Sequence, residues 1–210
     1  MEFHLWAAFA AASIALLLIP GPTVLLVLSY AISQGRRVAV ATAAGVALGD
    51  LIAMSTSLAG LGALVLTSAR LFTTLKWIGA VYLVFLGVQL FRSAPSATLG
   101  RLDDAPDLSA GRVFAHAALV TALNPKSNIF FIAFVPQFIN PGAALLPQFV
   151  WLTASFVGFA AANALGYALL ADKLRQRIAR PSVMPMLSRV GGGALVAMGL
   201  ATAALRRAAG

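Results

Sequence analysis

The sequence has no cysteine and few charged residues. Charged residues make up 10% of its 210 residues and hydrophobic residues 60%, whereas ordinary soluble domains carry about 25% charge. This balance predicts a polytopic membrane protein. Without cysteine the chain can form neither a disulfide nor a thiolate site, and no grouping of His, Cys and Asp suggests a bound metal.

The signatures of ATP hydrolysis and of common hydrolases are also missing. The sequence contains no Walker glycine-rich loop, no serine nucleophile elbow and no HExxH pattern. We therefore expect no cofactor and no catalytic residues. Any transport must then be driven by an ion gradient or run downhill.

The chain is strongly basic, with a formal net charge of +9. A basic chain suggests nucleic acid as a partner, but here the Lys and Arg residues fall in short gaps between apolar runs, which is the positive-inside pattern of membrane proteins. They concentrate after the first, third and fifth runs, so both termini are predicted to be periplasmic. The start, Met1–His4, has no Lys or Arg and no cleavage pattern follows, which favours a first transmembrane helix over a signal peptide.

Six apolar runs are long enough to cross a bilayer as helices. The long polar stretch 92–112 divides one transmembrane domain, 1–210, into halves of about 5–91 and 113–205. The expected spans are approximately Leu5–Ser33, Val38–Leu66, Leu75–Phe91, Val113–Phe138, Leu146–Ala171 and Leu187–Leu205.

Two of the six runs are interrupted by proline. Pro20-Gly21-Pro22 breaks the first run and Asn124-Pro125 breaks the fourth. Proline removes a backbone donor, and in lipid the freed backbone groups must face protein or a wet cavity. Paired interruptions at corresponding places in two halves indicate a transporter's binding site. The alternative is a pair of packing kinks.

The two halves show a weak internal repeat. The two proline breaks align with each other, and Asp50 aligns with Asn163. Because each half has three spans, the second must enter the membrane in the opposite sense. The predicted fold is all-α: six transmembrane helices as two inverted three-helix repeats with broken first and fourth helices. Chance matching among small residues is the alternative.

Residues around the breaks and two interior charges are the candidate binding residues. A half-helix that starts after each break offers N–H groups and a partial positive charge, which suit a carboxylate, and Asn124 is a good N-cap for a helix starting at Pro125. Uncharged polar groups within spans, such as Tyr167, are expected to bond neighbouring helices. The candidates for substrate binding or coupling are Pro20, Gly21, Pro22, Thr23, Asp50, Asn124, Pro125, Lys126 and Asn163.

Asp50 and Lys126 carry opposite charges inside predicted spans. A mid-membrane aspartate costs about 2.5–3.5 kcal/mol on insertion scales and usually faces the protein interior. Either the two form a structural ion pair, or Asp50 binds a substrate ammonium or carries a coupling proton; these roles are compatible. Just before Asp50, Gly45 and Gly49 permit close approach of another helix.

Taken in order, several motifs resemble the lysine exporter family, in its homoserine/threonine exporter branch. The motifs are Pro20-Gly21-Pro22, Gln34-Gly35-Arg36-Arg37, Gly45-x3-Gly49-Asp50, Lys76-x2-Gly79-Ala80-x-Tyr82-Leu83-x3-Gly87, Asn124-Pro125-Lys126 and Phe130-Phe131-x4-Pro136-Gln137-Phe138. The resemblance implies export of amino acids or close derivatives across the inner membrane, with proton antiport and a homodimeric assembly. It would put the Pro20–Pro22 and Asn124–Lys126 segments and Asp50 at the family's signature positions.

Two other classes of function stay open from the residues alone. A membrane-embedded enzyme would need convergent catalytic side chains, and the span interiors offer one Asp, one Lys and no His or Cys partner for them. A scaffold subunit would use the breaks only to shape packing, and would show a sealed, dry interface around Pro22, Asp50 and Pro125.

Overall fold

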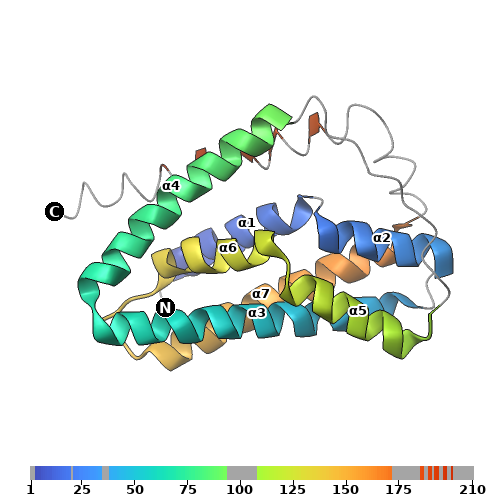
Figure 1. The fold of residues 1–210 in the computed structure, drawn as a ribbon, viewed down its shortest axis with the longest axis horizontal. Coiled ribbons are helices and arrows are strands. Elements are labelled where there is room, and N and C mark those ends of the chain that lie inside the picture. Colours follow the sequence, from blue (N-terminus) through green and yellow to red (C-terminus); the bar gives the residue numbers. More distant parts are fainter. Residues whose placement is uncertain are drawn as a thin grey trace.

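The computed structural model describes residues 3–19, 21–34, 38–93 and 108–171, together with scattered helical positions between 185 and 200. Several sequence predictions fall outside these residues: Pro20, the basic turn 35–37, most of the 92–112 connector, the basic loop after residue 171 and most of the sixth span. Within the described residues every regular element is a helix (Figure 1), which confirms the all-α prediction.

The first apolar run forms two helices. Helix α1 covers Phe3–Leu18 and α2 covers Pro22–Gln34, and the two axes meet at 55°. Pro22 occupies the first position of α2, where its missing N–H costs no intrahelical bond. The predicted break is therefore present, and it separates two half-helices rather than kinking one.

The fourth run breaks in the same manner. Helix α5 covers Ala110–Ala122 and α6 covers Pro125–Ala133, followed by a 3₁₀ turn, η3, over Val135–Phe138. The bend between the two parts is 45°. Asn124 caps α6 by accepting a hydrogen bond from the Lys126 N–H at 3.1 Å, which confirms the predicted N-cap.

The unbroken helices are α3, Ala39–Thr67, α4, Ala69–Ser93, and α7, Leu145–Leu169. Only Ser68 separates α3 from α4, so α4 starts six residues before the predicted third span at Leu75. Ser68 explains the tight junction, because its hydroxyl accepts from the Leu71 N–H at 3.3 Å. The gap between the predicted second and third spans, which contains Arg70 and suggests a linker in the sequence, is therefore largely the first turn of α4.

Two to four of these helical segments can cross a membrane by length and composition. Among the described residues, Ala39–Ala63 of α3 and Leu145–Leu169 of α7 qualify alone, and the α1–α2 and α5–η3 pairs qualify if each is one span. Exposed side chains on α3, α4 and α7 are large and apolar, as a lipid-facing surface requires: Val40, Leu51, Ile52, Leu71, Ile78, Val81, Phe85, Val150 and Trp151.

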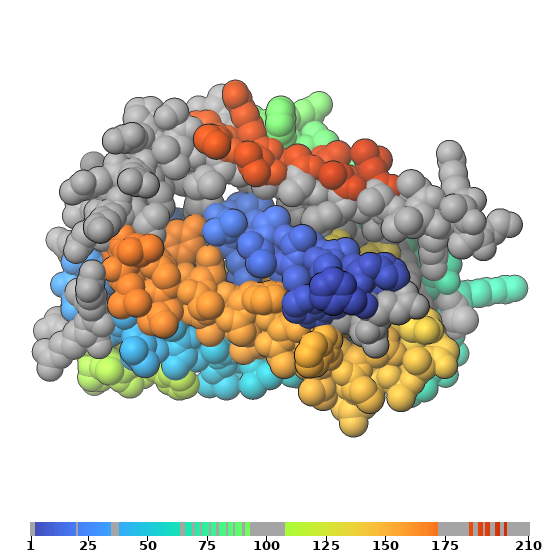
Figure 2. All heavy atoms as spheres, turned by 180° about the vertical axis from the view of Figure 1, so that it is seen from behind, coloured from blue at the N-terminus to red at the C-terminus, as the bar shows by residue number. Residues whose placement is uncertain are grey.

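Each broken pair packs against an unbroken helix from the other half. Helix α3 lies along α5 and α6, while α7 lies along α1 and α2. Figure 2 shows α1 and α7 side by side on one face, where the Trp6 Nε1 donates to Ser155 Oγ at 3.0 Å. The two halves are therefore interleaved rather than separate bundles.

Aromatic rings fill the core beneath the second break. The rings of Phe130 and Phe134 are 4.7 Å apart and those of Phe134 and Phe138 are 4.8 Å apart. The ring centroids of Phe138 and Phe9 of α1 are 5.4 Å apart, and those of Phe130 and Phe156 of α7 are 6.0 Å apart. This packing fixes α6 and η3 against α1 and α7, so the second break is held at a defined place.

Candidate functional site

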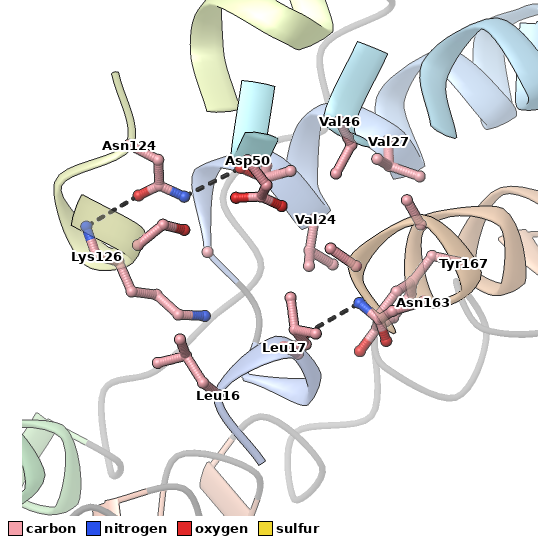
Figure 3. Close-up of a pocket in the computed structure, with 15 residues that line it drawn as sticks. Leu16, Leu17, Val24, Val27, Val46, Asp50, Asn124, Lys126, Asn163 and Tyr167 are labelled. Atoms are coloured by element: carbon pink, nitrogen blue, oxygen red, sulfur yellow. Dashed lines mark hydrogen bonds between the residues drawn. The ribbon is translucent and has the colours of Figure 1, made fainter. Parts of the chain in front are cut away.

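Both breaks open onto one small cavity (Figure 3), which the ends of α1, α2 and α6 enclose together with α3 and α7. The cavity has a volume of about 30 Å³. A water molecule needs about 10–15 Å³ of such space, so the cavity holds small groups but no whole amino acid. Its lining consists of Leu16, Leu17, Gly21, Thr23, Val24, Val27, Val46, Asp50, Asn124, Lys126, Ser127, Ala160, Asn163, Ala164 and Tyr167.

The first break frees backbone carbonyls at the end of α1. In an unbroken helix the Leu18 carbonyl would accept from residue 22, but Pro22 has no N–H. Side chains from other elements take over these carbonyls. Asn163 Nδ2 donates to Leu17 O and Tyr167 Oη donates to Leu18 O, each at 3.2 Å.

Lys126 bonds the third carbonyl at the C-terminal end of α1. Its Nζ donates to Ile19 O at 2.6 Å. A cation beside a helix C-terminus also meets the negative end of the helix dipole. The side chain reaches there by lying over Gly21, where a Cβ would be 3.4 Å from Lys126 Cδ. Lys126 therefore joins the start of α6 to the end of α1.

Asn124 links the two breaks from the other side. Its Nδ2 donates to Thr23 Oγ1 at 3.0 Å while its Oδ1 caps α6. Thr23 Oγ1 also lies 3.4 Å from Thr121 Oγ1 of α5. The carbonyl of Ala122, freed at the end of α5, accepts from Asn128 Nδ2 at 2.9 Å. These contacts bring the two breaks together in space.

A glycine seam sets the position of Asp50. Cβ atoms added at Gly45 or Gly49 would collide with α5; at Gly49 one would lie 2.5 Å from Ala118 O. The glycines thus let α3 approach α5 at backbone distance. On the adjacent face of α3, Val46 and Asp50, four residues apart, point into the cavity (Figure 3).

Asp50 is the unsatisfied polar group of the cavity. Its side chain is 2% exposed, and its Oδ1 has no hydrogen-bond partner. Asp50 and Lys126 interact electrostatically, but no direct ion pair joins these two side chains, both of which belong to the described part of the chain. The sequence left a structural ion pair open; in this structure Lys126 bonds Ile19 O instead.

The structure brings six of the nine candidate residues to the cavity and leaves three aside. Gly21, Thr23, Asp50, Asn124, Lys126 and Asn163 line it. Pro22 and Pro125 start their helices with exposed side chains and do not line the cavity, and Pro20 lies outside the described residues. Their part in binding or coupling stays a prediction.

Sequence reasoning did not assign two polar lining residues, Ser127 and Tyr167, to the cavity; it expected Tyr167 only to bond a neighbouring helix, which it does. Tyr167 lies one helical turn after Asn163, so both point the same way from α7. That spacing is the signal that could have assigned Tyr167 to the cavity. Ser127 gave no such signal, since it follows the conspicuous Asn124-Pro125-Lys126 and nothing in the pattern tells which way it points.

Comparison with known proteins gives one family. A family model for LysE type translocators matches residues 14–205. The chain is 36% identical over 208 residues to the homoserine/homoserine lactone efflux protein of Salmonella typhimurium, covering 99% of this chain and 100% of that protein. It is 34% identical over 200 residues to an uncharacterized membrane protein of Vibrio cholerae, covering 95% and 97%.

A shorter match is to a protein that is named for a different substrate. The leucine efflux protein of Salmonella typhimurium is 33% identical over 128 residues, which is 61% of this chain and 60% of that protein. No solved structure matches the chain.

Proposed function

Because the chain belongs to the LysE family of translocators, we propose that it exports amino acids or close derivatives across the inner membrane. The family puts it among transporters rather than enzymes. The observation that carries the proposal is the convergence of two helix breaks and one unpartnered carboxylate on a single cavity. A scaffold would have sealed this place with dry packing.

The substrates in the relatives' names narrow the chemical class of the transported molecule, the cargo. Their names specify homoserine, its lactone and leucine. All three carry an α-ammonium group and no charged side chain, and the lactone has no free carboxylate. The cargo of this chain is accordingly a small uncharged-side-chain amino acid or a derivative that keeps the amino group.

Asp50 is the acceptor for that ammonium. A charged hydrogen bond inside a low-dielectric site is stronger than a neutral one, and Oδ1 has no protein partner to give up. In the first turns of α2 and α6, the N–H groups of Thr23, Val24 and Ser127 have no intrahelical acceptors and can donate to the carbonyl or carboxylate end of the cargo. The Lys126 N–H, in contrast, is already held by Asn124. Gly21, Thr23 and Asn124 keep those helix starts at the cavity.

The same carboxylate accounts for proton antiport. A buried ionised carboxylate without a partner is costly in a membrane. Asp50 is neutral if it holds a proton, and it is paired if it holds the cargo ammonium. If Asp50 cannot hold the proton and the cargo ammonium at the same time, an inward proton and an outward amino acid use this one site in turn.

Alternating access between two inverted three-helix units completes the proposal. Helices α1 and α7 run parallel, since Trp6 meets Ser155 and Leu18 meets Tyr167. In the predicted topology the first and fifth spans, which contain α1 and α7, also cross the membrane in the same direction. The reciprocal packing of α3 on α5–α6 and of α7 on α1–α2 supports units that exchange their broken helices. Homodimer formation remains what the family resemblance implies.

The present cavity corresponds to a closed state. Its volume of about 30 Å³ admits no amino acid. Opening must separate contacts that now cross it: Lys126 to Ile19, Asn163 to Leu17, Tyr167 to Leu18 and Asn124 to Thr23. The first three of these contacts involve backbone carbonyls at the C-terminal end of α1. The hinge of the proposed motion therefore lies at the first break.

Efflux from proteoliposomes tests the proposal. Vesicles loaded with labelled homoserine or leucine should release it when the outside is acidified. We expect Asp50→Asn to lower the initial rate about ten- to a hundredfold, because a charged hydrogen bond contributes about 1.5–3 kcal/mol. Thr56→Val is the matched control, since Thr56 is exposed on the same helix and bonds only its own backbone. Full proton-coupled efflux by Asp50→Asn would remove Asp50 from the mechanism.

A further inference from the structure

We propose that the cavity selects its cargo by the ammonium group and does not require a carboxylate charge. Amides, lactones and esters of small aliphatic amino acids would then be carried as well as the acids, whereas N-acylated amino acids would not. This inference rests on the proposed export function and defines the substrate class of the same site.

The first support is the kind of group left unpartnered. Asp50 lines the cavity with a side chain that is 2% exposed, and its Oδ1 has no hydrogen-bond partner. A buried acceptor that carries negative charge favours a cation with N–H donors. A primary ammonium group provides both, and it is close in size to the water-sized space available.

The second support is that the cationic donor lining the cavity, Lys126, and the side-chain donors of Asn163 and Tyr167 are already engaged. A carboxylate would ordinarily be met by a cationic side chain, and Lys126 is the cation lining this cavity. Its ammonium is held by Ile19 O at 2.6 Å. Asn163 and Tyr167 donate to Leu17 O and Leu18 O. Opening separates these bonds, but once the site closes around the cargo, a donor that stayed on the cargo would leave a buried carbonyl at the end of α1 without a partner, which is unfavourable.

What remains for the far end of the cargo is the pair of helix starts together with the uncharged Ser127 hydroxyl. Backbone N–H groups at a helix N-terminus donate to a carboxylate, but they donate to a neutral carbonyl with the same geometry. An amide or a lactone therefore keeps these hydrogen bonds. It loses only the attraction between its charge and the helix dipole, which is a small effect.

The remaining wall restricts the body of the cargo. It consists of aliphatic side chains and alanines, namely Leu16, Leu17, Val24, Val27, Val46, Ala160 and Ala164. A second charge on the cargo would face these groups without a partner. Short aliphatic side chains fit, while acidic and strongly basic side chains do not.

Ligand-induced thermal stabilisation of the purified full chain in detergent tests the inference, because it is insensitive to passive leakage of amides across vesicles. The probes are L-leucine, L-leucinamide and N-acetyl-L-leucine, with L-homoserine and its lactone as a second set. Leucinamide and the lactone should raise Tm about as much as the parent amino acids, by about 5 °C near a hundred times Kd. N-acetyl-L-leucine should leave Tm unchanged.

Two variants connect the shifts to the carboxylate. Asp50→Asn should remove the shift with every probe, and Thr56→Val should keep all of them. Stabilisation by the amino acids but not by leucinamide or the lactone overturns the inference and leaves export intact. A shift with N-acetyl-L-leucine equal to that with leucine overturns it as well. If no probe shifts Tm and vesicles show no efflux, the proposed function itself fails.

Discussion

At the residue scale, the interruption of α1 explains why polar side chains gather at the cavity. Three successive carbonyls, of Leu17, Leu18 and Ile19, lose their intrahelical donors, and three side chains from distant positions replace them. Buried carbonyls are nearly always satisfied in this way. The donors of the cavity thus serve the broken helix, while Asp50 is left to act on a ligand.

A double-variant cycle on Asp50 and Lys126 tests whether these charges depend on each other without direct contact. Asp50→Asn leaves the Lys126 ammonium, and Lys126→Met leaves the Asp50 carboxylate, uncompensated in an apolar site. We expect the double variant to be more stable than the sum of the single effects by about 0.5–3 kcal/mol. Unfolding of the detergent-solubilised protein at neutral pH measures the three differences.

The single-variant values carry separate information. Lys126→Met should destabilise by about 1–3 kcal/mol even beside Asp50→Asn, because Ile19 O then has no donor, and by more in the unmodified chain, where it also leaves the carboxylate uncompensated. Additivity within about 0.5 kcal/mol would contradict the predicted coupling. It would mean that Asp50 is already neutral when the cavity is empty and that Lys126 only secures α1.

Local chemistry made part of the site predictable. The cap at Asn124 follows from residue type and the adjacent proline, and the structure confirms it. The partner of Lys126 does not follow, because sequence shows a charge without showing which backbone groups a distant break will free. Opposite charges left an Asp50–Lys126 pair open, yet the Lys126 ammonium donates to the Ile19 carbonyl at 2.6 Å instead.

At the element scale, the contact of α3 with α5 holds the cavity in shape. Gly49→Ala should destabilise the protein, since a Cβ there would lie 2.5 Å from Ala118 O and 2.6 Å from Thr121 Cβ. Overpacking of this kind costs about 1–3 kcal/mol, so Tm should fall by several degrees. Efflux should fall too, because Asp50 is the next residue and moves with the backbone.

Gly60→Ala is the matched control on the same helix. Nothing lies within 4 Å of a Cβ at Gly60, and alanine favours a helix over glycine by about 1 kcal/mol. Its Tm should stay unchanged or rise. Equal destabilisation by the two substitutions would show that loss of glycine itself, and not the α3–α5 contact, matters.

The elements themselves were largely predictable from apolar length and proline. Both breaks occur where Pro22 and Pro125 place them, because proline cannot continue a helix yet starts one well. The beginning of α4 was not predictable to a residue. Arg70 suggested a linker, but a charged side chain on the exposed first turn of a helix reads the same in sequence as one in a loop.

At the scale of the whole molecule, helix direction links packing to membrane topology. Helices α3 and α5 run parallel, since Gly45 meets Ala117 and Gly49 meets Thr121, and α1 and α7 do likewise. Parallel neighbours from different halves need an odd number of spans between them, which is one between the second and fourth spans and three between the first and fifth. The predicted topology, with odd-numbered spans entering from the periplasm, meets that condition for both pairs.

The absence of cysteine makes that topology directly measurable, because the unmodified chain has no background reaction with maleimides. Ser109 precedes α5 and Ala143 precedes α7, and both are exposed. If α5, α6 and η3 form one span, the two positions lie on opposite sides of the membrane. A membrane-impermeant maleimide should label Ala143→Cys in intact cells and Ser109→Cys only after permeabilisation, since basic loops stay in the cytoplasm.

The reverse pattern would place the termini in the cytoplasm. Labelling of both positions in intact cells would mean that the second broken pair re-enters without crossing, and the two halves could then not be inverted three-span units.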